Sequence, residues 1–122
     1  MCGIVGIGDY SKQGIGYKEW DIFQQLLVAD SARGLDGTGI IKIDEDGKID
    51  WRKKTGNPFS LLYDKDVSKF LSLIVTKEFN RFLIGHNRYA TTGGVSNDSA
   101  HPFQSEHIHM VHNGTLTSGS TL

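Results

Sequence analysis

The sequence has one cysteine, no long apolar run and no excess of charge of either sign, and each lack narrows what the protein can be. One cysteine cannot form an internal disulfide, which favours a reducing compartment, so we expect a cytoplasmic protein. Apolar stretches such as residues 71–75 fall far short of the roughly 20 residues of a membrane span. No basic segment precedes the apolar residues 3–7, so we expect neither a secretory signal nor a membrane partner.

The charges are balanced, with 13 Lys and Arg against 14 Asp and Glu and a net charge of −1. No run of one sign forms a field that would attract nucleic acid, so we expect no nucleic-acid partner, and a small neutral or zwitterionic ligand stays open. The 122 residues suffice for one modest hydrophobic core. We therefore treat residues 1–122 as a single domain, or part of one.

Apolar periodicity predicts an α+β chain. The helical segments are expected at residues 18–32, ending near Gly34, and at 64–77, with Asp64 or Asp66 as N-cap. Strands are expected at residues 3–7, 81–89 and 107–113, and a long loop over 91–103 joins the last two. A hairpin is also expected, with a two-residue turn at Asp46-Gly47.

Cys2 lies one removable methionine from the mature N-terminus. If Met1 is removed, the α-amine of Cys2 lies a few bonds from its thiol, and an amine pKa of about 7.7 to 8.0 suits proton transfer near neutrality. Such an amine can activate the thiol as a nucleophile without a separate histidine. The alternative is that Cys2 is only a small buried side chain at the start of a strand.

Two further segments carry groups that acyl transfer requires. Asn113 and Gly114 follow a predicted strand and offer a carboxamide N–H and a backbone N–H to a developing oxyanion, although Asn-Gly is also a common tight turn. Arg88, with Thr91 and Thr92 just beyond, could bind a carboxylate, although an isolated arginine is usually a solvated surface group.

The histidines at 101, 107, 109 and 112 raise a metal alternative. His107 and His109 would face one side of a predicted strand and could share a zinc ion. Neither a second cysteine nor a helical HExxH pattern accompanies them, and we expect no metal and no cofactor.

Five motifs in order carry a resemblance to a known family: MCGIVGI at the start, RGLDGTGI at 33–40, GHNRYATTGG at 85–94, AHPF at 100–103 and HNGTL at 112–116. Together they resemble the class II glutamine amidotransferase domain, an N-terminal nucleophile (Ntn) hydrolase. The resemblance implies an α-β-β-α sandwich of antiparallel sheets. It also implies that Cys2 attacks the side-chain amide of L-glutamine, forms a glutamyl thioester and releases ammonia to an acceptor.

The resemblance also assigns roles to the neighbouring motifs. Asn113 and Gly114 match the oxyanion hole, and Arg88 matches the arginine that binds the glutamine α-carboxylate. The residues beside Arg88 that match the substrate segment are Tyr89, Thr91 and Thr92, although many members carry histidine or alanine at the last position. The residues that match the family's R-G-x-D turn near the nucleophile are Arg33, Gly34 and Asp36.

Members of this family have a longer domain, so the chain is expected to be its N-terminal portion and the sandwich to be incomplete. The family's aspartate that holds the substrate's α-amino group would lie beyond Leu122. Two functions therefore stay open: a glutaminase component that serves an acceptor-processing domain or subunit, or a catalytically incomplete binding module completed by another half-domain.

Overall fold

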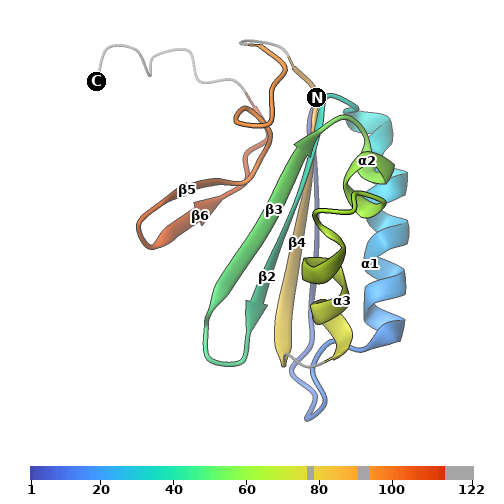
Figure 1. Ribbon diagram of the computed structural model, residues 1–122, viewed down its shortest axis with the longest axis vertical. Coiled ribbons are helices and arrows are strands. Elements are labelled where there is room, and N and C mark those ends of the chain that lie inside the picture. Colours follow the sequence, from blue (N-terminus) through green and yellow to red (C-terminus); the bar gives the residue numbers. More distant parts are fainter. Residues whose placement is uncertain (77–78, 91–93, 115–122) are drawn as a thin grey trace.

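The computed structural model describes residues 1–76, 79–90 and 94–114. Its centre is a four-stranded antiparallel sheet with the strand order β1-β4-β2-β3 (Figure 1). The strands are β1 (Gly3–Gly8), β2 (Gly37–Asp44), β3 (Ile49–Thr55) and β4 (Asn80–Arg88). The α+β class with antiparallel sheets is thus confirmed, and the architecture is compatible with part of an Ntn sandwich.

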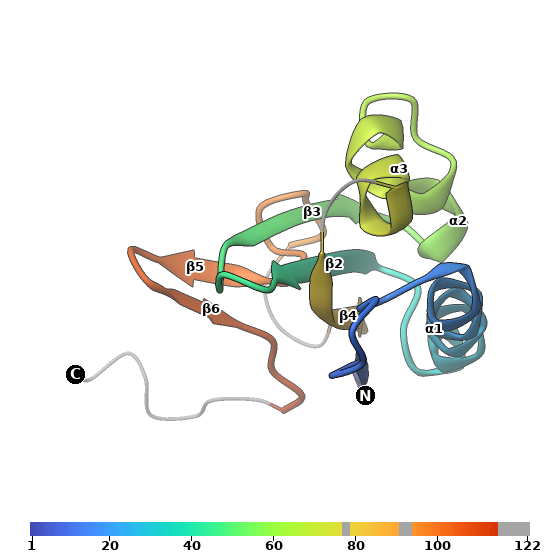
Figure 2. The same cartoon turned by 90° about the horizontal axis from the view of Figure 1, so that it is seen from below.

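Three helices cover one face of this sheet: α1 (Tyr17–Asp30), α2 (Pro58–Leu62) and α3 (Ser68–Thr76) (Figures 1 and 2). The hydrophobic core lies between these helices and the sheet, because apolar side chains of both layers are buried there. Its buried members are Ile15, Phe23, Leu27, Ile40, Leu61, Val67, Phe70, Ile74 and Leu83. Burial of this surface contributes about 25 cal/mol per Å² and fixes which face of β1 and β4 turns toward the helices.

The opposite face of the sheet carries the segment that contains AHPF. Gly39 in β2 has no side chain, and a Cβ there would lie 1.6 Å from the carbonyl oxygen of His101. The main chain of this segment can therefore lie directly on the sheet. It continues into a small hairpin of β5 (Phe103–Ser105) and β6 (Ile108–Met110), which extends away from the sheet in Figure 1.

Several predicted boundaries are corrected. The first helix ends at Asp30 and is followed by the 3₁₀ turn η1 (Ser31–Arg33), so Gly34 caps that turn in an extended conformation. The loop of the β2–β3 hairpin has four residues instead of two, and its Gly47 has a φ of +84°. The Asp44 carboxylate accepts hydrogen bonds from two amides of this loop, which stabilises the longer turn.

The second predicted helix is shorter than expected, and a separate short helix before it was missed. α3 begins at Ser68, four residues after the expected start, because Asp64 accepts a hydrogen bond from the Asp66 amide in the preceding turn and pairs with Lys54. The missed helix α2 begins after Asn57, whose side chain accepts a hydrogen bond from the Ser60 amide.

The predicted strand over residues 107–113 shortens to β6, and its partner β5 falls at the end of the expected long loop. No helix within the described residues is long and apolar enough to cross a membrane.

Candidate active site

Cys2 immediately precedes β1, at the end of the sheet where β4 finishes. The antiparallel register pairs Gly3 with Asn87, so Cys2 lies beside the residues that follow. The Tyr89 amide donates to the Cys2 Sγ at 3.4 Å, and the same sulfur lies 3.8 Å from the Tyr89 carbonyl oxygen. The half-buried thiol is therefore held by the main chain of Tyr89, directly after β4, while still in contact with solvent.

Arg88 is the last residue of β4 and follows Asn87, the partner of Gly3. Side chains of opposed residues share a face, so continuing the register by one pair puts Arg88 on the face of Cys2, opposite the helices. Arg88 is 8% exposed. Its Nη1 donates to the carbonyl oxygen of Gly94 at 2.9 Å and to the hydroxyl of Ser99 at 3.0 Å, which orients the guanidinium.

The R-G-x-D turn packs against the same end of β4. The Asp36 amide donates to the Arg88 carbonyl oxygen at 2.9 Å, and the Ala90 amide donates to the Asp36 carboxylate at 2.7 Å. Gly34 is buried, and a Cβ there would lie 2.4 to 2.6 Å from main-chain atoms of Arg88 and Tyr89. This turn and the end of β4 thus form one hydrogen-bonded unit around the thiol.

Arg33 lies at the N-terminus of the chain, where its Nη1 contacts the Met1 sulfur at 3.0 Å. A hollow of about 270 Å³ opens beside it. The hollow is lined by Ala32, Arg33, Gly34, Leu35, Asp36 and Tyr89. The hollow and the thiol share one neighbour, Tyr89, whose amide contacts the Cys2 sulfur.

Asn113 and Gly114 are exposed and follow a segment that returns from β6 toward the N-terminus of the chain (Figures 1 and 2). Gly114 has a φ of +149°, in a region that favours glycine. The preceding residue, His112, is bonded through its carbonyl oxygen to His86 of β4, which pairs with Ile4. The two predicted oxyanion residues are thereby brought to the Cys2 end of the sheet. The predicted positions Thr91 and Thr92 lie outside the described residues.

His86 and His101 are site residues that sequence reasoning missed as a pair. Their rings stack with centroids 3.8 Å apart and planes 6° from parallel. Burial lowers the pKa of His86, and burial together with the neighbouring His86 lowers the pKa of His101 to about 4. The signal in the sequence was the pair of motifs GHNR and AHPF, but nothing in their spacing shows that the two rings meet.

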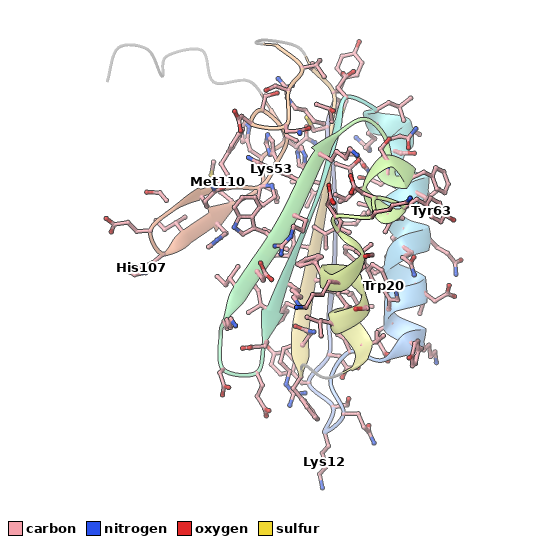
Figure 3. The ribbon with its side chains drawn as sticks, in the orientation of Figure 1. Lys12, Trp20, Lys53, Tyr63, His107 and Met110 are labelled. Atoms are coloured by element: carbon pink, nitrogen blue, oxygen red, sulfur yellow. The ribbon has the colours of Figure 1, made fainter. Side chains whose placement is uncertain are left out.

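The premise of the zinc alternative is wrong. His107 lies in the turn between β5 and β6, at the hairpin tip seen in Figure 3, so it does not alternate with His109 along one strand. Within residues 1–76, 79–90 and 94–114, no group of three or more His, Cys, Asp or Glu side chains could hold a metal ion.

No family model matches the chain. It is 34% identical over 116 residues to a glutamine–fructose-6-phosphate aminotransferase (isomerizing) of Corynebacterium glutamicum, covering 95% of this chain and 16% of that protein. It is 33% identical over 125 residues to the amidophosphoribosyltransferase of Pasteurella multocida, covering 100% and 22%. Another aminotransferase of the first kind, from Helicobacter pylori, is 32% identical over 126 residues, covering 100% and 18%.

The chain therefore spans about a fifth of the length of these relatives. The antiparallel α+β fold, with Cys2 directly before its first strand, is compatible with part of the sandwich of N-terminal nucleophile hydrolases. The predicted relationship is confirmed: the chain is related to the N-terminal domain of the class II glutamine amidotransferases.

Proposed function

We propose that this chain is the N-terminal part of a glutaminase domain that hydrolyses the side-chain amide of L-glutamine and supplies ammonia to an acceptor. The observation that carries the proposal is the position of Cys2. Its thiol is bonded to the main chain of Tyr89 just after β4, and Tyr89 also lines the hollow beside the R-G-x-D turn. The relationship with class II amidotransferases supports the same reaction.

In the proposed reaction, removal of Met1 frees the α-amine of Cys2, which takes the thiol proton directly or through a water molecule. The sulfur attacks the amide carbon of glutamine and forms a tetrahedral intermediate, whose oxyanion accepts hydrogen bonds from the Asn113 side chain and the Gly114 amide. Collapse of the intermediate transfers a proton to the leaving nitrogen, releases ammonia and leaves a glutamyl thioester. Water then hydrolyses the thioester to glutamate and restores the thiol.

The remaining predicted residues bind the substrate or hold the site in place. The guanidinium of Arg88 binds the α-carboxylate of glutamine, with Tyr89 and the threonines at 91 and 92 completing the substrate segment. Gly34 and Asp36 hold the end of β4 in place, and Arg33 lies near the mature N-terminus once Met1 is gone. These steps need no metal or organic cofactor.

The ammonia acceptor is proposed to be processed by another domain or subunit, because the chain spans only about a fifth of its relatives. Those relatives carry two different names, glutamine–fructose-6-phosphate aminotransferase and amidophosphoribosyltransferase. Since both match the same part of this chain, this part does not determine which acceptor receives the ammonia. A cytoplasmic location stays a prediction, which cell fractionation would check.

The test is labelling with 6-diazo-5-oxo-norleucine, a reactive glutamine mimic, followed by intact and peptide mass spectrometry. We expect one adduct on Cys2 of the Met1-trimmed protein, and we expect free L-glutamine to compete it away. Molecules that retain Met1 serve as an internal control and should stay unlabelled, since their Cys2 nitrogen is part of a peptide bond and cannot act as a base. Arg88→Lys should slow labelling at limiting reagent, because a lysine cannot form the bidentate contact.

Cys2→Ser is the matched control for the site of attachment and should give no adduct. A folded, trimmed wild-type protein that gives no adduct would overturn the glutaminase proposal for this chain and favour the binding-module alternative. Adding a candidate complementing half-domain would then show whether the pocket needs a partner.

A further inference from the structure

Two buried histidines hold the main chain of one residue, His112, between them. His86 is 0% exposed and His101 6% exposed, and their rings stack face to face. His86 Nε2 lies 2.8 Å from the carbonyl oxygen of His112, and the His112 amide donates to His101 Nδ1 at 3.0 Å. Both main-chain polar groups of His112 are therefore bound by the stacked pair.

The partners fix the protonation of both rings. A carbonyl oxygen can only accept, so His86 must carry its proton on Nε2. An amide can only donate, so His101 Nδ1 must present a lone pair, and its proton must lie on Nε2. His86 Nδ1 is buried and has no hydrogen-bond partner among the described residues. A second proton on either ring would therefore remove a bond to His112 or introduce an unsolvated charge.

The residue that is held, His112, lies directly before the predicted oxyanion residues Asn113 and Gly114. The hairpin of β5 and β6 that leads to it forms a separate two-stranded sheet. Lys53 Nζ donates to the carbonyl oxygens of Asp98 and Pro102, which secures the start of this segment on β3. At the other end of the hairpin, the two bonds of His112 secure the chain to β4.

We infer that His86 and His101 form a clamp on His112 that positions Asn113 and Gly114 at the Cys2 end of the sheet, and that the bond from the His112 amide holds only while His101 Nδ1 is unprotonated. The inference rests on the proposed function for the role of Asn113 and Gly114. Both histidines are positioning residues, since they act through the main chain of His112.

The charges around the clamp oppose its protonation. Groups that lower the pKa of one or both rings are the partner imidazole, His112, Arg88 of β4 and Lys53 of β3. The hydrogen bond to the His112 carbonyl oxygen and the charge of Asp30 at the end of α1 raise the pKa of His86, but burial outweighs both. At pH 7 the clamp is closed, and it opens as the pH falls toward about 4, the pKa of His101.

A structural readout that needs no activity tests the clamp. Amide hydrogen exchange of residues 112–114 at pH 7, corrected for intrinsic rates, should be about tenfold faster in His101→Ala than in wild type, the effect of one lost hydrogen bond. His101→Asn keeps an acceptor near the Nδ1 position and should restore most of the protection. His107→Ala changes a histidine at the exposed hairpin tip and should leave exchange unchanged.

The ¹⁵N chemical shifts of the imidazoles provide the second readout. We expect both His86 and His101 to be neutral Nε2–H tautomers at pH 7 and neither to titrate near pH 6.5. An Nδ1–H tautomer for His101, an ordinary titration, or unchanged exchange in a folded His101→Ala would each overturn the clamp.

A kinetic readout then separates the clamp from the proposed function. In a wild type that turns over glutamine, His101→Ala should lower kcat more than it raises KM, because oxyanion donors act in the transition state. Unchanged kcat with fast exchange would overturn the positioning role. A wild type that neither labels nor turns over glutamine would refute the proposed function, while the exchange and tautomer data would still decide whether the clamp exists.

Discussion

At Gly34 the turn after η1 comes so close to the Arg88–Tyr89 peptide that only a hydrogen atom fits between them. This contact matters to the site because Tyr89 holds the Cys2 sulfur and Asp36 holds the Ala90 amide. A glycine is required here by close approach and not by backbone conformation, since its φ of −175° is accessible to any residue. The geometry of the candidate site thus depends on a glycine, which has no side chain, at position 34.

Gly34→Ala should destabilise the protein by about 1–3 kcal/mol, as overpacking does. The added Cβ would lie 2.4 Å from the Arg88 carbonyl carbon, so the turn or the end of β4 must shift. Urea unfolding measures the loss, and labelling of Cys2 should slow with it. Gly6→Ala is the control: its Cβ would make an ordinary contact of 3.7 Å with the Leu83 carbonyl oxygen, so equal losses in the two variants would contradict this account.

Residue-level reasoning identified Cys2 and Arg88, and the fold brings both to one end and one face of the sheet. It missed His86 and His101, because a ring stack between residues 15 positions apart depends on how the loop folds back onto the sheet. Spacing along a strand led instead to His107 and His109, and that reasoning failed when His107 proved to be in a turn. Local periodicity cannot report contacts that tertiary packing makes.

At the scale of elements, the strands and long helices follow from periodicity, whereas short elements do not. The helix α1 was expected because its apolar residues recur at helical spacing, and β1, β2 and β4 because their apolar runs are bounded by turn residues. The strands β5 and β6 have three residues each, too few to show a period. The five-residue helix α2 is equally short, but Asn-Pro at its start was a readable signal.

The N-cap of α2, Asn57, gives a testable prediction. Asn57→Ala removes the side-chain bond to the Ser60 amide and should cost about 0.5–2 kcal/mol of stability. Asn57→Ser keeps a capping oxygen and should retain most of that stability. Thermal and urea unfolding of the wild type and the two variants measure these losses of stability. An Asn57→Ser variant as unstable as Asn57→Ala would show that the capping hydrogen bond does not stabilise the helix.

At the scale of the whole molecule, the central sheet is covered differently on its two faces. The helices bury the apolar core on one face, and on the other the chain around His101 lies against β2, where His101 stacks on His86 of β4. The chain leading to the predicted oxyanion residues is thus fixed largely by polar contacts whose strength depends on protonation. Acid should therefore act on this side of the molecule before it acts on the core.

Stability should fall in two steps as the pH is lowered. The pKa values of His86 and His101 are below their ordinary 6.5, so the unfolded chain binds more protons than the folded one between about pH 6.5 and 4, and stability falls over that interval. The pKa values of Asp9 and Asp64 are below 3.8, because hydrogen bonds from Ser11 and Lys54 stabilise the carboxylates. Their contribution is therefore lost only below about pH 4.

Urea midpoints measured from pH 8 to 3 check both steps, and one substitution in each pair separates them. His101→Asn cannot take up a proton and should flatten the upper step while leaving the lower one. Asp64→Asn should reduce the lower step alone. Asp64 pairs with Lys54 and lies between α2 and α3, the helices that cover the face of the sheet opposite the imidazole stack. An upper step that persists unchanged in His101→Asn would mean that His101 is protonated as easily in the folded protein as in the unfolded chain and that another group causes the step, which the burial of His101 argues against.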